Sequence, residues 1–353
     1  MDHESTLFKT NAIFKEFDIC SSLFTQRELV DASISECAIL YRAVSYNEVN
    51  LYFLDLSSES TTGTFKDWAA CATVAYCKRN NIDEFVTQSS GNTANAIAKY
   101  CRENGIKSHI FYLKENESKI KRELVYDDEW ITLHEVASSE KEMKKMTEGF
   151  SFDKGIPWLP NIEIQIQSNS IRADIVQYIS NELNIKFDWK SQALSSGYGV
   201  FGFYNGLNRL GVNPGSGYKL HGVQQSAVCP YVNRFFPNNL EKINFTRETV
   251  IEKTLFRTSP TDNLYELMRQ IIDKFGGHIT VVTNRDYDEY SAIASSLMMQ
   301  AGIKLRKDVE NSYLEKSGLI NTCGILKAIQ NGLIKGGENV LVAVTGGGLR
   351  VIA

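Results

Sequence analysis

The sequence predicts an α/β fold, in which parallel β-sheets carry helices on both faces. Short apolar runs alternate with helix-like segments from residue 38 to residue 344. This alternation is typical of parallel strands joined by crossover helices. The length of 353 residues exceeds one average domain, and no repeat, low-complexity segment or long linker interrupts the chain. We therefore expect a doubly wound, parallel-sheet fold, built either as two domains that interleave along the sequence or as one large α/β unit with an insert.

The first half of the chain begins with an arm and continues into the first alternation. Residues 1–36 are expected to form an arm with short helices, because apolar residues such as Phe8, Phe14 and Leu23 recur there in small groups. Asn104-Gly105 is a stop signal for one of the following helices. The expected strands are 38–41, 49–54, 84–87, 109–113 and 130–133, and the expected helices are 64–79, 92–103 and 117–122.

The second half repeats the alternation and ends on the most apolar strand. Gly276-Gly277 follows one helix pattern directly, and glycine at this place ends helices. The run at 339–344 is almost entirely apolar, which is typical of a strand buried on both faces. The expected helices are 175–183, 201–210, 263–275, 287–300 and 319–331, and the expected strands are 220–223, 279–282 and 339–344.

Composition and charge narrow the possible functions. Apolar residues make up 43% of the chain and charged residues 23%, which is ordinary for a globular protein with a core. The net charge of -4 and the scattered Lys and Arg argue against a nucleic-acid partner, which needs a basic surface. No apolar run reaches the length of a membrane span, and the polar N-terminus has no signal-peptide pattern.

The cysteines and histidines predict a reduced compartment and no metal site. The seven cysteines include no CxxC pair, and Cys71, Cys77 and Cys101 fall within expected helices, where buried free thiols are common. We therefore expect a cytoplasmic protein. The five histidines lie far apart in the sequence and lack the spacing of metal ligands, so no metal is predicted.

Lys66 is the first candidate for chemistry. It closely follows Gly63 on a tight turn and begins an Ala-rich helix, so we expect its stem to be buried. Both this burial and the helix N-terminus disfavour the ammonium form, and enzymes activate a nucleophilic lysine in this way. The alternative interpretation is a solvated lysine in a first helical turn, which is the more common case for one lysine taken alone.

The loop Ser89-Ser90-Gly91-Asn92-Thr93 is a candidate anion-binding loop. It joins a parallel strand to a helix, so it lies at the carboxyl edge of the sheet, where α/β proteins bind ligands. Its N–H groups and three hydroxyls suit a carboxylate or phosphate, and the Asn92 amide can donate to a phenolate oxygen. The alternative interpretation is a plain helix cap, for which Ser, Asn and Thr are the usual residues.

Two later glycine-rich segments have a similar character. The small residues of Ser195-Ser196-Gly197-Tyr198-Gly199, just before a helix, allow backbone amides to close around a phosphate. Thr345-Gly346-Gly347-Gly348 follows the apolar strand at 339–344, and a hydroxyl beside three glycines suits the close approach of a flat ring. Each segment alone is also explained by an ordinary turn.

The four segments occur in the order found in fold-type II enzymes that depend on pyridoxal phosphate (PLP), the group that resembles the tryptophan synthase β-subunit. From residue 37 onward the chain is most similar to threonine synthase. Asn169-Ser170-Ile171-Arg172, which we expect before a helix, is similar to the segment that opens the second domain of threonine synthases. The lysine motif of the family looks like Gly63-Thr64-Phe65-Lys66-Asp67, and its Ser-Gly-Asn-Thr loop looks like Ser90-Gly91-Asn92-Thr93. Its Gly-rich phosphate loop looks like Ser196-Gly197-Tyr198-Gly199, and its C-terminal Thr-Gly-x-Gly-Leu looks like Thr345-Gly346-Gly347-Gly348-Leu349.

The resemblance implies pyridoxal 5'-phosphate as the cofactor and a role for each segment. Lys66 would hold PLP as a Schiff base and later move the α-proton of the substrate. Asn92 would bond the 3'-oxygen of PLP, and Thr345 would bond its pyridine nitrogen. The cofactor phosphate would be held by Ser195, Ser196, Gly197, Tyr198 and Gly199. The substrate carboxylate would be held by Ser89, Ser90, Gly91, Asn92 and Thr93.

The resemblance also implies a domain organisation with the cofactor between two domains. Residues 37–60 and 165–353 would form the large PLP-binding domain. Residues 61–164 would form the small domain, with the lysine helix and the substrate loop. Family members are commonly dimers, so we expect a homodimer in which the arm of residues 1–36 could reach a partner subunit.

The departures from the family pattern predict an altered substrate side. The family usually has Pro and Arg at the positions of Thr61 and Trp68, a smaller residue at Tyr198 and a Lys-x-Glu pattern where this chain has Leu54-Asp55-Leu56. We therefore expect a PLP-dependent lyase or synthase, threonine synthase-like or cysteine synthase-like, that acts on an amino acid with a β or γ leaving group. The alternative is a non-catalytic relative that serves as a binding or regulatory module.

Overall fold

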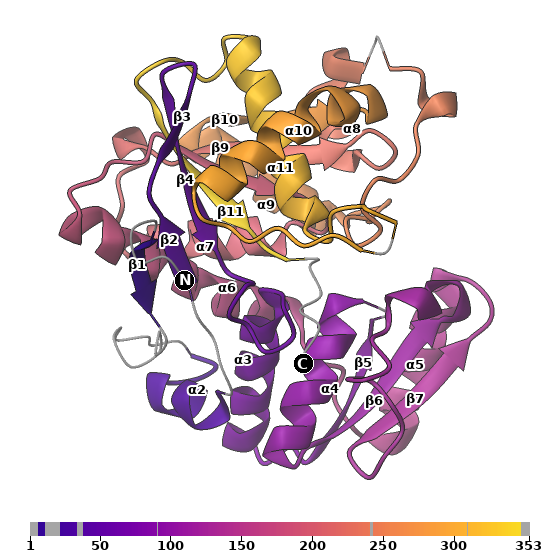
Figure 1. The fold of residues 1–353 in the computed structure, drawn as a ribbon. Helices are drawn as coiled ribbons and strands as arrows, with labels where there is room; N and C mark the ends of the chain where they lie inside the picture. Colours follow the sequence, from indigo (N-terminus) through magenta and orange to yellow (C-terminus); the bar gives the residue numbers. More distant parts are fainter. Residues whose placement is uncertain are drawn as a thin grey trace.

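The chain forms two sheets in which parallel strands predominate, with helices packed against both faces. The computed structural model describes residues 6–10, 22–33, 38–89, 91–240, 243–308 and 310–346. Figure 1 shows the larger sheet in the upper part of the molecule and the smaller sheet in the lower part. The expected α/β fold with parallel sheets is therefore confirmed.

The larger sheet is parallel through its centre. Its strand order is β1-β2-β4-β11-β8-β9-β10, and neighbours from β4 to β10 run parallel. β2 and the short β3 run antiparallel to β4. The strands are β1 (Thr6–Thr10), β2 (Ala38–Tyr41), β3 (Val44–Tyr46), β4 (Val49–Asp55), β8 (Trp189–Ala193), β9 (Lys219–Gln225), β10 (Gly277–Val282) and β11 (Asn339–Val344).

The hydrophobic core covers both faces of this sheet, as β11 illustrates. Leu341 packs in one cluster with α6, α7 and α9, whereas Val340 and Val342 pack in a second cluster with α10 and α11. Successive side chains of a strand point to opposite faces, so an unbroken apolar run suits a strand that is covered twice. The helices are α6 (Ile162–Glu182), α7 (Tyr198–Arg209), α9 (Asp262–Phe275), α10 (Asn284–Gln300) and α11 (Lys316–Gln330).

The smaller sheet has the parallel order β5-β6-β7. Phe111 and Leu113 of β6 pack with Met143 of α5, whereas Ile110 and Tyr112 pack with α3 and α4, so this sheet is also covered twice. The elements are β5 (Glu84–Gln88), β6 (Lys107–Leu113), β7 (Ile131–Val136), α3 (Lys66–Arg79), α4 (Asn92–Asn104) and α5 (Glu140–Lys154), with α2 (Gln26–Ala32) packed on α3.

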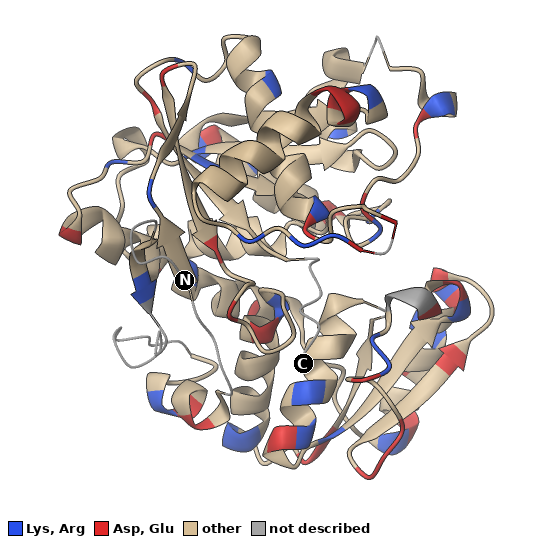
Figure 2. Cartoon of the chain, in the orientation of Figure 1, with Lys and Arg blue, Asp and Glu red and all other residues tan. Residues whose placement is uncertain are grey.

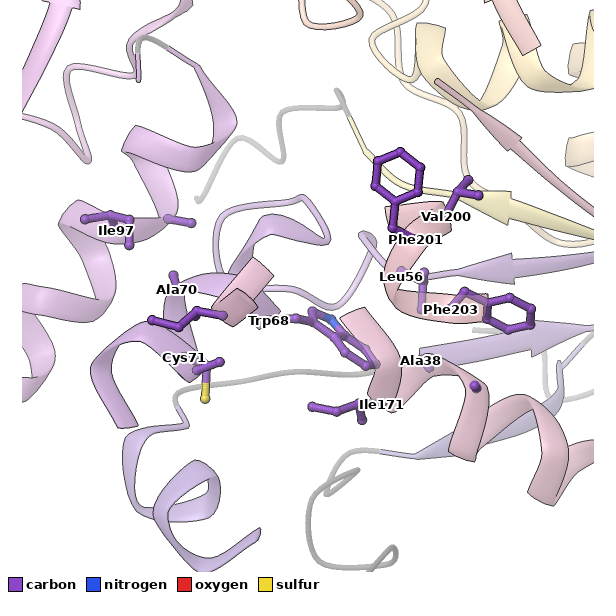
Figure 3. Close-up of a cluster of buried hydrophobic side chains, with 14 of the residues drawn as sticks. Ala38, Leu56, Trp68, Ala70, Cys71, Ile97, Ile171, Val200, Phe201 and Phe203 are labelled. Atoms are coloured by element: carbon purple, nitrogen blue, oxygen red, sulfur yellow. The ribbon is translucent and has the colours of Figure 1, made fainter. Parts of the chain in front are cut away.

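Helix α3 joins the cores of the two sheets. It contacts α4 beside the smaller sheet and α6 beside the larger one. Figure 3 shows Trp68 of α3 in a cluster with Ile171 of α6 and Phe203 of α7, and all three side chains are fully buried. Trp68 is therefore a core residue between the two sheets, and the expectation that it alters the substrate side is not supported.

The arm differs from the expected series of short helices. Residues 6–10 form β1, which pairs antiparallel with β2 and extends the larger sheet of the same chain. Phe8 packs on Tyr178 of α6, with ring centroids 5.7 Å apart. Residues 26–32 do form a short helix, α2. Residues 11–21, which were also assigned to the arm, lie outside the described part of the chain.

Helix α6 begins well before the expected start near residue 175. It starts at Ile162, so Asn169–Arg172 lies inside the helix and not before it. The polar residues of its first half obscure the apolar pattern, although Ser168, Asn169, Ser170 and Arg172 are buried in this helix, which packs on α7. A Cβ on Gly206 of α7 would lie 2.4 Å from the Ser170 carbonyl oxygen, so α7 approaches α6 closely at this glycine.

Two elements were not expected because their residues are polar. In β8, the Ser191 Oγ is buried between His221 Nδ1 at 2.9 Å and Asn321 Oδ1 at 2.7 Å. In α5, most charged residues are exposed. The α-helix expected over 117–122 is instead a 3-10 helix over Lys114–Lys119. The remaining short helices are α8 (Pro230–Phe235), Pro214–Ser216, Pro237–Leu240 and Phe245–Arg247.

The described residues bear on several of the expectations from composition. Figure 2 shows Lys and Arg positions interspersed with Asp and Glu positions along the ribbon. Cys71, Cys77 and Cys101 are buried and form no disulfide among the described residues, in agreement with the expectation of buried thiols. Within the described ranges, no helix is both long enough and apolar enough to cross a membrane.

Candidate active site

Three loops at the carboxyl edge of the larger sheet form the candidate site. The lysine loop (residues 56–65) follows β4, the Gly197 loop (residues 194–199) follows β8, and Thr345 and Gly346 follow β11. β4, β11 and β8 are parallel neighbours, so their carboxyl ends lie at one edge of the sheet. This edge is where α/β proteins bind ligands.

The lysine loop contacts the end of β11 directly. The Phe65 N–H donates to the Thr345 carbonyl oxygen at 3.2 Å. Gly346 has a φ of 88°, and a Cβ there would lie 2.4 Å from the Gly63 carbonyl oxygen, so this position requires glycine. The structure therefore brings together the segments of Lys66 and Thr345. Gly347, Gly348 and Leu349 lie outside the described residues.

Asp67 holds the lysine loop against the start of α3. Its carboxylate accepts hydrogen bonds from the Thr62 N–H at 2.9 Å and from the Thr62 hydroxyl. The Lys121 Nζ donates to the Thr62 carbonyl oxygen at 2.9 Å. Burial raises the pKa of Asp67 to about 7, although its bonds to Thr62 and the charge of Lys121 act in the opposite direction. The lysine loop is thus held at Thr62 by hydrogen bonds to both Asp67 and Lys121.

The Lys66 amine lies in an apolar and cationic environment. The side chain is half-buried, and its Nζ lies 4.7 Å from the centroid of the Phe65 ring. The Arg172 guanidinium lies 5.3 Å from the same ring. Desolvation and, secondly, the charge of Arg172 lower the pKa of Lys66 to about 8. A substantial fraction of the amine is therefore neutral near neutral pH, as a nucleophile or base requires.

The Gly197 loop opens helix α7. Gly197 has a φ of 90°, and a Cβ there would lie 2.7 Å from the Phe201 ring. The Tyr231 hydroxyl donates to the Ser196 carbonyl oxygen at 2.8 Å. The first N–H groups of a helix have no acceptor within it, so those of Tyr198 and Gly199 suit an anion.

Arg172 and Lys190 form a cationic wall behind this loop, and both are 1% exposed. The Arg172 guanidinium donates to the Gly199 carbonyl oxygen and, at 3.3 Å, to both Gln192 Oε1 and the Asn169 carbonyl oxygen. The Lys190 Nζ donates to Gln192 Oε1 at 3.3 Å and to the Ser191 carbonyl oxygen at 3.1 Å. Burial lowers the pKa of Arg172 to about 9. Burial and, secondly, the charge of Arg172 lower the pKa of Lys190 well below its ordinary value.

Two buried carboxyl groups, Asp55 and Glu315, have hydrogen-bond partners that lie beside Gly346. The Asp55 carboxylate accepts from the Ser57 N–H at 2.9 Å, and a Cβ on Gly346 would lie 2.8 Å from the Ser57 Cβ. The Ser317 hydroxyl lies 2.6 Å from Glu315 Oε1 and 3.2 Å from the Gly346 carbonyl oxygen. Burial, followed in the same direction by the charges of Asp55 and Glu252, raises the pKa of Glu315 to about 7.

The Ser89–Thr93 loop leads from β5 into α4, next to α3. The Ser89 N–H donates to the Phe111 carbonyl oxygen at 3.0 Å, and α4 begins at Asn92. Gly91 is the N-cap, and its N–H donates to the Ser89 Oγ at 3.5 Å. Asn92 and Thr93 are half-buried, and Ser90 lies outside the described residues. In the described part, no hydrogen bond joins Asn92 to Lys66.

Sequence reasoning missed several groups of this site. Arg172 entered only through a motif resemblance, and Lys190, Lys121, Glu315 and Asp55 were given no role. Lys190 and Lys121 lie in polar stretches that predict exposed surface. Their local sequence offered no signal, because their burial depends on elements that are distant along the chain.

Other clusters and cavities lie apart from this edge. His109 connects Glu84, at 2.8 Å, with His134, at 3.0 Å, on the smaller sheet. Across the described ranges, no group of three or more His, Cys, Asp or Glu residues is arranged to hold a metal ion. A cavity of about 630 Å³ follows β9 and α8, and Cys229 and Tyr265 are among its lining residues.

The site fits the cofactor that the resemblance implies. Lys66 provides an amine with a lowered pKa, and the first turn of α7 provides N–H donors for a phosphate. The missing Cβ at Gly346 lets the end of β11 approach the lysine loop closely. The cationic wall and the two carboxyl groups offer partners of both signs for a molecule with an anionic and a basic end.

Comparisons with known proteins agree with this fit. A family model described as pyridoxal-phosphate dependent enzyme matches residues 40–346. Threonine deaminase isoform 2 from Solanum lycopersicum is 15% identical, with 86% of this chain and 81% of that chain covered and a TM-score of 0.61. No curated protein matches the sequence.

Two racemases have similar structures. Serine racemase from Dictyostelium discoideum is 14% identical, with 86% of this chain and 88% of that chain covered and a TM-score of 0.61. A pyridoxal 5'-phosphate-dependent aspartate racemase is 13% identical, with 94% of this chain and 98% of that chain covered and a TM-score of 0.61. At these identities, the likeness to the solved structures shows a shared fold.

Proposed function

Because the chain belongs to the family of pyridoxal-phosphate dependent enzymes, we propose that it is a lyase or synthase for an amino acid with a leaving group at its β or γ carbon. The observation that carries the proposal is Lys66. Its amine has a pKa of about 8 and lies at the sheet edge where the lysine loop meets Thr345. A structural lysine needs neither feature.

Three loops supply the groups that would hold the cofactor. The N–H groups that open α7 would bind the phosphate, together with the small residues Ser195 and Ser196. Thr345 would bond the pyridine nitrogen, and Asn92 would bond the 3'-oxygen. When bound, PLP supplies an electron sink for negative charge at the substrate α-carbon.

The chain's own residues would handle the proton and the substrate. Lys66 would take the proton from the α-carbon in its neutral form and return it as the ammonium. The loop of residues 89–93 would bind the substrate carboxylate with its N–H and hydroxyl groups. The similar structures are named for threonine, serine and aspartate, which all carry a polar group on the β-carbon. This supports β-chemistry over γ-chemistry.

The first experiment tests the cofactor and its attachment. Purified protein supplied with PLP should be yellow, and borohydride should abolish the visible band and leave the cofactor on Lys66 in a peptide map. The variant Lys66→Ala should take up no reducible label. Colourless wild-type protein that binds no PLP would contradict the proposal.

The second experiment tests catalysis. A panel of serine, threonine, aspartate and their O-acyl and O-phospho derivatives should include a substrate that changes the visible spectrum and releases a keto acid. Lys66→Ala should lower that release by about 10²-fold or more. PLP that binds without a spectral change across the whole panel would favour the alternative of a non-catalytic binding module.

A further inference from the structure

The cationic wall behind the Gly197 loop lacks a counter-charge. Arg172 and Lys190 are both 1% exposed, and their hydrogen-bond partners are carbonyl oxygens and the neutral Gln192 amide. Among the described residues, neither forms an ion pair with a carboxylate. A buried charge costs several kcal/mol unless an opposite charge accompanies it. The protein without ligand therefore retains an electrostatic cost at this point.

The chain pairs other part-buried cations with carboxylates. Arg209 of α7 contacts Asp174, a carboxylate that is only 9% exposed, and Lys327 Nζ lies 2.6 Å from Asp286. Arg209 is a useful comparison, because it also connects α7 with α6. Arg172, on the same pair of helices, has no such partner among the described residues.

Arg172 lies directly against the first turn of α7. A Cβ on Gly199 would lie 2.4 Å from Gln192 Nε2 and 3.0 Å from an Arg172 Nη. Gly199 thus allows the guanidinium to reach the same turn whose N–H groups suit a phosphate. A guanidinium has five N–H donors, and the hydrogen bonds of Arg172 in the described structure leave donors for an anion.

We propose that Arg172, held by Gln192 and backed by Lys190, is the charged partner of the cofactor phosphate behind the Gly197 loop. The inference rests on the proposed function for the identity of the anion. The phosphate dianion would supply the missing counter-charge, and the backbone N–H groups of α7 would add directional bonds. Arg172 is therefore a binding and positioning residue, and Gln192 keeps its guanidinium in place.

The test compares three ligands on the protein freed of cofactor. PLP and pyridoxal differ by the phosphate alone, and inorganic phosphate probes the anion site without the ring. The variants are Arg172→Met, Arg172→Lys and, as the matched control, Arg209→Met. Dissociation constants come from absorbance and tryptophan fluorescence titrations, and thermal unfolding reports stability.

Arg172→Met should weaken PLP binding by about tenfold or more and pyridoxal binding much less, because the rise in the Lys66 pKa affects both ligands and the loss of the phosphate partner affects PLP alone. The affinity of Arg172→Lys for PLP should lie between those of the wild type and Arg172→Met. Inorganic phosphate should raise the unfolding temperature of the wild type and not that of Arg172→Met. The ligand-free Arg172→Met protein should be at least as stable as the wild type, whereas Arg209→Met should be less stable and bind PLP normally.

The inference is overturned if Arg172→Met binds PLP as tightly as the wild type, or loses PLP and pyridoxal equally. A ligand-free Arg172→Met protein that is markedly destabilised and still responds to phosphate would also overturn it, since Arg172 would then be a structural residue. Phosphate stabilisation that depends on Arg172 in a protein that binds no PLP would support the anion site and refute the proposed function.

Discussion

Lys66 shows how a common residue acquires a special amine. Its pKa is lowered to about 8 from the ordinary 10.5, first by desolvation and then by the charge of Arg172. Sequence reasoning expected desolvation and a helix N-terminus, and the structure adds a buried guanidinium from α6. The Arg172 guanidinium and the Lys66 amine both lie against the ring of Phe65, a residue next to Lys66 in the sequence.

The lowered pKa predicts the pH dependence of Lys66 labelling in the cofactor-free protein. An amine reacts in its neutral form, so acylation of Lys66, followed by peptide mass spectrometry, should be half-maximal near pH 8. Arg172→Met should move this midpoint upward, but not to the ordinary value, because desolvation is the larger cause. A wild-type midpoint near pH 10.5 would show that the amine is solvated.

At the scale of elements, Lys121 connects the lysine loop with helix α4. Its Nζ donates to the Thr62 carbonyl oxygen of the lysine loop at 2.9 Å, and its N–H donates to Asn95 Oδ1 of α4 at 3.1 Å. Burial raises the pKa of Asp67, and the charge of Lys121 opposes this rise. Asp67 in turn holds Thr62. The start of α3 and the start of α4 are therefore positioned by one residue from the segment before β7.

Replacement of Lys121 should loosen the lysine loop. Lys121→Met removes a part-buried hydrogen bond and the cation beside Asp67, so stability should fall by about 1–3 kcal/mol in urea unfolding. The matched control is Lys114→Met, which removes an exposed ion pair with Glu135 and should change stability by less than about 0.5 kcal/mol. Equal losses of stability in the two variants would show that Lys121 does not hold the lysine loop in place.

At the scale of the whole molecule, buried ionisable groups tie stability to pH. Glu315 is 8% exposed, and its pKa rises from 4.5 to about 7. The folded state then holds this proton more tightly than the unfolded chain. The stability from this group is full below pH 4.5 and is lost as the pH rises toward about 7.

Glu315→Gln should therefore flatten the pH dependence of unfolding. The neutral amide cannot ionise, so the variant should gain up to about 3 kcal/mol relative to the wild type between pH 4.5 and pH 8. His221, whose pKa is lowered to about 3 by burial, shifts stability the opposite way at lower pH in both proteins. The variant-minus-wild-type difference in chemical denaturation isolates Glu315, and a difference independent of pH would refute the assignment.

Much of the fold could be predicted from local sequence patterns. Apolar runs such as 339–344 and stop signals such as Gly105 depend on near neighbours, and the structure confirms both elements. The prediction failed where polar residues are buried, as in β8 and the first half of α6. There, long-range partners such as Asn321 for Ser191 satisfy the polar groups, and no local pattern reveals them.

The sequence by itself determined the order of the Lys66, Ser89–Thr93, Gly197 and Thr345 segments, and with it the fold and the PLP-dependent family. It did so because short motifs carry local backbone requirements, such as the glycine turns at Gly63 and Gly197. Only the tertiary structure decided which charges lose their water. Arg172 and Lys190 are buried without a carboxylate because α6, β8 and α7 pack together, and this balance of desolvation and missing counter-charge is a property of packing.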